Sequence, residues 1–119
     1  MLSINYSFNP LRMVISKKEP IEFTVELTNK FDKDVMASLE IIMPKEISFG
    51  KGTFKKNILE RIDCLKAGEK KVFHYALSAH PLYIEPGEIT IGVNANIHHK
   101  GYSYIERAFR KDVSLIVSE

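Results

Sequence analysis

Apolar and polar residues alternate along several stretches of this chain, as side chains do on the two faces of a β-strand. The clearest case is residues 21–28, where glutamate and threonine separate the apolar positions Ile21, Phe23, Val25 and Leu27. The same period of two runs through residues 70–79 and 89–97. We therefore predict a half-buried strand in each stretch, with one dry face and one wet face.

The remaining sequence predicts further strands with local irregularities. Residues 2–8 form a first strand that Asn9-Pro10 interrupts, because proline has no N–H for a strand ladder, and residues 11–15 resume it with a new partner. Residues 35–43 form a returning strand, and residues 58–65 form a short strand whose inward face is ambiguous. Residues 45–57 are the least regular part, which predicts a long connection with room for one short edge strand.

The last predicted strand, within residues 102–117, contains a conflict. Arg107 and Lys111 share the parity of the apolar positions around them and would be buried in a regular strand. A β-bulge or bend between Glu106 and Asp112 would resolve this conflict, because an extra residue reverses the facing of the residues after it.

No stretch shows a helical period, and the spacing of the strands leaves no room for crossover helices. About seven antiparallel strands therefore predict an all-β fold in which two sheets pack as a β-sandwich. A length of 119 residues fits one domain, residues 1–119, whose core needs no disulfide.

The order of the turns resembles a known immunoglobulin-like group. Residues 25–29 (VELTN), the strand ending at Pro44, residues 65–69 (LKAGE) and residues 86–89 (PGEI) are similar to the CARDB (cell-adhesion-related) and NPCBM-associated prokaryotic domains. In these domains an asparagine closes the second strand, an A-G-E-type turn follows the sheet switch, and a P-G-x turn opens the penultimate strand. The resemblance implies an immunoglobulin-like β-sandwich with a binding or spacer role, and it implies no catalytic residues.

Composition narrows the function only slightly. A hydrophobic content of 45% and a charged content of 27% are ordinary for a globular protein, and a net charge of +2 is too small to imply a nucleic-acid or membrane partner. One cysteine allows no internal disulfide, the N-terminus lacks the pattern of a signal peptide, and no apolar run is long enough for a membrane span. We expect a cytoplasmic protein, or an extracellular one if the chain is a domain of a longer protein.

The reactive residues do not form the patterns of an enzyme or a metal site. There is no G-x-S-x-G elbow, and Cys64 is expected to be a small buried apolar residue of its strand. His98 and His99 are adjacent, so in a strand they point to opposite faces and cannot easily share one ion. We expect surface or hairpin histidines, no cofactor, no metal and no small-molecule substrate.

Two basic stretches contain an aromatic residue, namely residues 51–56 (KGTFKK) and 107–111 (RAFRK). A ring between cations could bind single-stranded nucleic acid or anionic lipid. Because acids are interspersed along the chain, a solvated loop and an edge strand protected by lysine and arginine are the favoured interpretation.

Apolar residues at positions expected to face solvent, together with the first basic stretch, indicate contact with an unknown protein partner or a second copy. The candidate partner-binding residues are Met36, Ile42, Phe54, Lys55, Lys56, Val72, Tyr83 and Ile84. We hypothesise a non-catalytic protein-interaction or assembly module that self-associates or binds another protein. The alternatives are a spacer or adhesion domain of a prokaryotic cell-surface protein, or a weak binder of an anionic ligand such as nucleic acid.

Overall fold

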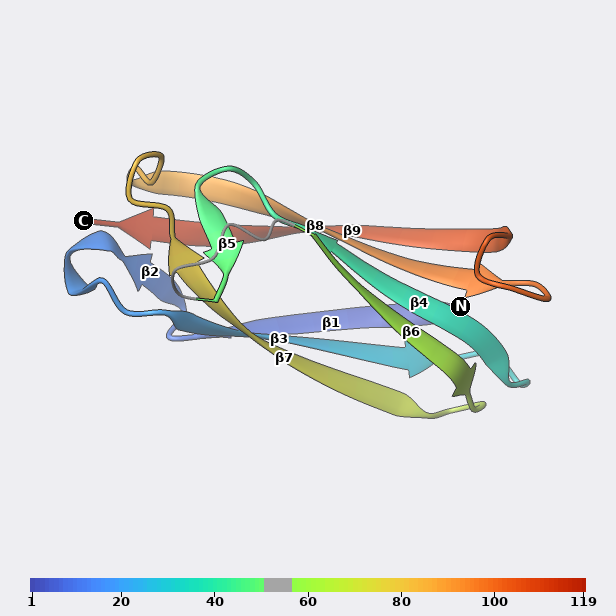
Figure 1. The fold of residues 1–119 in the computed structure, drawn as a ribbon. Coiled ribbons are helices and arrows are strands. Elements are labelled where there is room, and N and C mark those ends of the chain that lie inside the picture. The colour runs from blue at the N-terminus through green and yellow to red at the C-terminus, as the bar shows by residue number, and fades with distance from the viewer. Residues whose placement is uncertain (51–56) are drawn as a thin grey trace.

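In a computed structural model that describes residues 1–50 and 57–119, two β-sheets pack face to face (Figure 1). Sheet A has the strand order β1-β3-β7-β5, and sheet B has the order β2-β9-β8-β4-β6. The elements are β1 (Leu2–Asn9), β2 (Arg12–Val14), the short 3-10 turn η1 (Ile15–Lys17), β3 (Ile21–Asn29), β4 (Val35–Ile42), β5 (Ile47–Phe49), β6 (Asn57–Leu65), β7 (Lys70–Ala79), β8 (Gly87–His98) and β9 (Ile105–Ser118). The predicted all-β sandwich is confirmed.

The described residues form nine strands, where the sequence predicts about seven. β2 and β5 are edge segments of three residues each, too short to show an alternation. The chain crosses from sheet A to sheet B at Asn9-Pro10, whose peptide bond is cis, so the predicted change of partner is confirmed. β2 then lies parallel to β9, which corrects the expectation that all strands are antiparallel.

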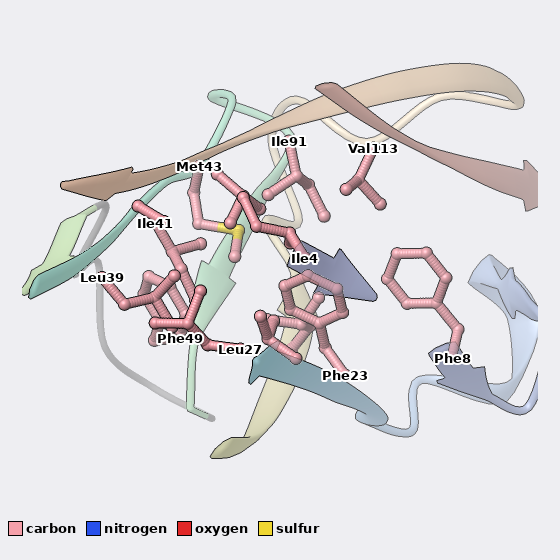
Figure 2. Close-up of a cluster of buried hydrophobic side chains, with 14 of the residues drawn as sticks. Ile4, Phe8, Phe23, Leu27, Leu39, Ile41, Met43, Phe49, Ile91 and Val113 are labelled. Carbon is pink, nitrogen blue, oxygen red and sulfur yellow. The ribbon is translucent and has the colours of Figure 1, made fainter. Parts of the chain in front are cut away.

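The core lies between the sheets and comes from the alternating positions. Figure 2 shows side chains of both sheets, such as Phe23 and Ile91, meeting in the space between the ribbons. The four apolar residues of β3 are at most 3% exposed, and burial of a large aliphatic or aromatic side chain contributes about 1.5–3 kcal/mol. The alternation along β3 therefore predicts its buried face correctly.

The ambiguous facing of β6 results from a β-bulge. Its register against β4 shifts, so that Val35 pairs with Leu65 while Ala37 pairs with Ile62. The extra residue in β6 lets Ile62 and Leu65, which have opposite parity, both point into the core. Cys64 is left on the exposed side, so the expectation that it is buried is wrong.

A buried asparagine joins the two sheets at one end. Asn29, the last residue of β3, is fully buried, and its Nδ2 donates to the Leu65 carbonyl oxygen of β6 at 2.9 Å. Its backbone N–H donates to the Glu69 carbonyl, and its carbonyl accepts from the Gly68 N–H. Gly68 has a φ of +78°, which suits glycine. The asparagine and the A-G-E turn, which are prominent in the sequence, are therefore in direct contact.

β9 extends along most of the molecule. Its 14 residues, at about 3.3 Å each, match the longest dimension of 47 Å. Figure 1 shows β8 and β9 running side by side over this length. We call residues 105–112, the first part of β9, the open half, and residues 113–118 the flanked half, because β2 lies beside their end.

The predicted bulge between Glu106 and Asp112 lies instead at the start of β9. The register against β8 shifts where Ile105 pairs with His98 and Arg107 pairs with Ile97, which leaves Glu106 as the extra residue. Pairing is regular from Arg107 onward, so no bulge separates the charged residues from the apolar ones after them. The two cations are accommodated because their side of the open half is exposed.

Candidate functional site

The two halves of β9 carry very different side chains on the same face. Val113, Leu115 and Val117 of the flanked half are at most 2% exposed. In the open half, Arg107 and Lys111 are exposed and Phe109 is half-buried. β2 pairs only with the last residues of β9, so it closes this side of the sandwich beside the flanked half and leaves it open beside the other.

Five side chains from three segments meet along this open side, and we call them the open-side strip: Tyr6, Phe31, Arg107, Phe109 and Lys111. The Arg107 guanidinium carbon lies 5.1 Å from the ring centre of Phe109 and 5.9 Å from that of Phe31. The Lys111 ammonium lies 5.4 Å from the ring centre of Tyr6. Both cations are therefore within the range of a cation–π interaction.

Hydrogen bonds hold the strip in place at its two ends. Lys111 Nζ donates to the Ile4 carbonyl oxygen at 3.1 Å, which joins β9 to β1, the edge strand of sheet A. The Phe31 backbone N–H donates to Asn29 Oδ1 at 2.9 Å, so the buried asparagine also positions this ring. The strip is therefore held by contacts that also connect sheet A with sheet B.

The two cations of the strip have no acidic partner among the residues that the structure describes. Within residues 1–50 and 57–119, no carboxylate lies at ion-pair distance from Arg107 or Lys111. On the opposite face of β9, by contrast, Arg110 Nε donates to Asp112 Oδ1 at 3.0 Å. The strip therefore presents two positive charges that are fixed by aromatic rings and not neutralised.

A hollow of about 280 Å³ adjoins the strip at the start of β9 and shares Phe31 and Arg107 with it. Its lining is mixed in charge and polarity and consists of Phe31, Lys33, Asp34, Val35, Met36, Ile97, His98, His99, Glu106 and Arg107. The Asp34 carboxylate is already engaged, since its Oδ1 accepts from the Ala67 N–H at 2.9 Å.

A buried polar pair lies on the outer face of sheet B. His98 Nε2 is 2.7 Å from Ser38 Oγ, and Asn96 Nδ2 donates to the same hydroxyl at 3.5 Å. His98 is only 7% exposed and His80 only 9%, so the expectation of surface or hairpin histidines is wrong about exposure for these two. The Nδ1 of His98 is buried and has no hydrogen-bond partner in the described part of the chain.

Tyr102, in the hairpin between β8 and β9, covers this pair. Its ring centre lies 5.0 Å from that of His98, and the Arg61 guanidinium carbon lies 4.9 Å from the tyrosine ring centre. The phenol donates to Asp63 Oδ1 at 2.6 Å. Partial burial, together with this hydrogen bond and the carboxylate charge, raises the pKa of Tyr102 to about 12.

A second phenol lies near the opposite side of the sandwich. The hydroxyl of Tyr75 on β7 is buried and has no hydrogen-bond partner among residues 1–50 and 57–119. Burial, and to a lesser extent the nearby Glu60 carboxylate of β6, raises the pKa of Tyr75. Among the residues that the structure describes, no cluster of histidine, cysteine and acidic side chains is suited to a metal ion. The same residues contain no helix that could cross a membrane.

The residues predicted to bind a partner lie on separate surfaces. Met36 and Ile42 are at opposite ends of β4, and Val72 is on β7 of the other sheet. Tyr83 and Ile84 follow β7 in the loop before β8, where Tyr83 stacks near His80. Of these five, only Met36 contacts the hollow beside the strip. The other predicted residues, Phe54, Lys55 and Lys56, lie outside the described residues.

The second basic stretch is the part of the sequence that leads to the strip. Arg107, Phe109 and Lys111 come from residues 107–111, and their alternate spacing places them on one face. Tyr6 and Phe31 were not identified from the sequence, because they reach the strip only through the packing of β1 and the β3–β4 loop against β9.

Similarity to one solved structure supports the sandwich fold. A FixG-related protein from Vibrio parahaemolyticus superposes with a TM-score of 0.54 at 14% identity, covering 98% of this chain and 95% of that one. A β-glucuronidase from Bacteroides uniformis gives a TM-score of 0.47 at 15% identity, covering 97% of this chain and 13% of that one. No protein-family model and no curated protein matches the sequence. At such identity the first similarity shows the fold alone.

Proposed function

We propose that this protein is a non-catalytic interaction module that binds an extended segment of another polypeptide along the free edge of β9. The observation that carries the proposal is that β8 pairs with β9 along one side, whereas on the other side β2 pairs only with residues 116–118. Within the described residues, the backbone of residues 105–115 therefore has no strand on that side. Such an edge can accept another strand, whose main-chain hydrogen bonds supply affinity.

The other sheet edges are less suited to this role. β5 is three residues long, and the Ile4 carbonyl of β1 already accepts the Lys111 ammonium. β6, with nine residues, is the remaining long edge. It offers a comparison within the same sheet, because Leu59 on β6 and Ile105 on β9 are 53% and 54% exposed.

The immunoglobulin-like assignment, and the relation to the CARDB and NPCBM-associated domains, form part of the same proposal. It is supported by the contact of Asn29 with the Ala67-Gly68-Glu69 turn, because the two motifs that resemble this group act together. The similarity to the FixG-related protein supports the sandwich fold only.

The test is selection of extended peptides from a displayed random library on the immobilised protein, followed by amide hydrogen exchange of the complex. We expect bound peptides to slow exchange within residues 105–115, because an added strand hydrogen-bonds these amides. Ile105→Asp should weaken binding about tenfold by placing a charge at an apolar contact, while Leu59→Asp should leave it unchanged.

Protection confined to β6, or equal losses from the two variants, would overturn the assignment to β9. Sedimentation over a concentration range identifies the case in which the partner is a second copy. Self-association that Ile105→Asp abolishes would support the β9 edge, and self-association that it leaves intact would argue against it.

A further inference from the structure

We infer that the segment received by β9 is acidic, with two carboxylates four residues apart and an apolar residue midway between them. This inference rests on the proposed function and names the partner's chemistry. It comes from the order of side chains along the open half, where Arg107, Phe109 and Lys111 occupy alternate positions of one face.

The spacing of these three residues sets the pattern of the partner. Residues two apart in a strand are separated by roughly 6.6 Å, so Arg107 and Lys111 lie about 13 Å apart along β9 with Phe109 midway. In an added strand, the residues directly opposite have Cβ atoms about 4.5–5.5 Å away. A carboxylate, an apolar side chain and a second carboxylate at alternate positions would therefore face these three residues in turn.

The charge of the strip favours an anionic partner specifically. Arg107 and Lys111 lack acidic neighbours within ion-pair distance in the described part of the chain, and they are held instead against aromatic rings. Asp112 alternates with this set and belongs to the opposite face, where it pairs with Arg110. Glu106, the bulge residue, lines the hollow that also contains Arg107, but its carboxylate forms no ion pair with the strip among the described residues. An incoming carboxylate therefore meets uncompensated positive charge and does not have to displace an existing ion pair.

An extended peptide fits the site better than a nucleic acid does. Rings and cations alone would also suit single-stranded nucleic acid. The strip, however, follows a strand whose outer backbone groups have no partner over residues 105–115 in the described structure. A peptide can satisfy those groups with its own main chain, and a nucleic acid has no matching ladder of N–H and C=O groups.

The experiment measures fluorescence anisotropy with labelled peptides about nine residues long, the usual length of a strand. The probe has glutamate, valine and glutamate at its third, fifth and seventh positions and threonine elsewhere. An isomer of identical composition has its glutamates at the third and sixth positions, which point to opposite faces of a strand. A third peptide has lysine in place of both glutamates. We expect the probe to bind about tenfold more tightly than the isomer, and more weakly as salt is added.

Variants of the protein locate the site. Arg107→Glu combined with Lys111→Glu should abolish binding of the probe, and the pair Arg107→Gln and Lys111→Gln should weaken it about tenfold. Lys17→Glu in η1, an exposed residue that follows β2 near the end of β9 opposite the strip, changes the charge of the protein in the same direction and should leave binding unchanged. Circular dichroism of each variant verifies that the fold is retained.

The outcomes separate this inference from the proposed function. Equal binding of the probe and its isomer, or tighter binding of the lysine peptide, would overturn the acidic pattern. If library-selected peptides protect residues 105–115 while the probe does not bind, the inference fails and the proposed function stands. If no peptide protects β9 and a short single-stranded DNA binds through Arg107 and Lys111, both fail.

Discussion

The open and flanked halves of β9 both pair with β8 and show the same alternation, yet their side chains have opposite surroundings. In the flanked half, Val113 and Leu115 are completely buried between the two sheets, and β2 lies beside the end of this half, at residues 116–118. In the open half, the equivalent positions hold Arg107 and Lys111, which are exposed against aromatic rings. The comparison shows that period-two alternation determines which side a residue faces, while neighbouring strands determine whether that side is dry.

The largest change in stability is expected when a cation like those of the open half is placed in the flanked half. Val113→Lys places an unpaired ammonium at a fully buried position and should lower the free energy of unfolding by about 4 kcal/mol. Urea denaturation followed by circular dichroism measures the change. Lys111→Val, the reverse change two residues earlier, is the matched control. A loss below about 1 kcal/mol for Val113→Lys would mean that water reaches the flanked half.

Truncation of one large apolar residue in each half is expected to have the next largest effect. Leu115→Ala leaves a cavity in a closed core and should cost about 3 kcal/mol. Phe109 is half-buried, so Phe109→Ala should cost about half as much despite the larger volume removed. The loss of unfolding free energy in each variant is measured from the shift in the midpoint of urea unfolding. Equal losses would show that the open half is as well packed as the other.

A smaller effect is expected when the contact between β9 and β1 is removed. Lys111→Met keeps most of the apolar stem but removes the charge and the hydrogen bond to the Ile4 carbonyl. A hydrogen bond from a charged group contributes about 1.5–3 kcal/mol, and partial exposure reduces this to about 1 kcal/mol. Thermal unfolding compares this variant with Lys17→Met. No difference between the two would show that Lys111 is free for a ligand at no cost to the fold.

The smallest effect concerns the hairpin that leads into the open half. Tyr102 has its pKa raised from the ordinary value of 10.0 to about 12, so its phenol stays neutral in the folded protein where it would ionise in the unfolded chain. The stability that comes from this group is therefore fully present below pH 10 and is lost as the pH rises through 12.

Phenolate absorbance across this alkaline range is the measurement. Tyr102→Phe should remove one phenol that ionises only at high pH. Tyr75 remains, and its pKa is also raised by burial. If the phenol that Tyr102→Phe removes titrates near pH 10 and not near pH 12, the hydrogen bond to Asp63 is not maintained. The open half would then begin with a frayed hairpin.

Much of the fold could be predicted from local pattern, because burial on β3 follows directly from its alternation. The change of partner at Asn9-Pro10 could also be predicted, since proline cannot continue a ladder. The parallel β2–β9 pair could not, because it joins segments at opposite ends of the sequence and β2 is too short to show a period. The position of the β9 bulge was missed because the sequence does not show that the inward side of residues 107–111 is exposed, which accommodates Arg107 and Lys111 without a bulge after them.

The candidate site could be predicted only in part. Residues 107–111 are conspicuous as a basic stretch around a phenylalanine, but Tyr6 and Phe31 join them through packing that no local pattern reveals. The exposure of Cys64 and the burial of His98 were also mispredicted, because both depend on contacts that no local pattern reveals. A bulge exposes the cysteine, and Tyr102 from the following hairpin covers the histidine.

The contact between Lys111 and Ile4 spans 107 residues of sequence, and β2 likewise depends on β9 for its place in sheet B. Contacts of such long range make folding slow, because the entropy of closing the chain is lost before the contacts form. During synthesis, β1 can pair with β3 early, but β2 has no strand to join until β9 has left the ribosome. The side of the sandwich that is open in the folded protein is therefore also the side that assembles last.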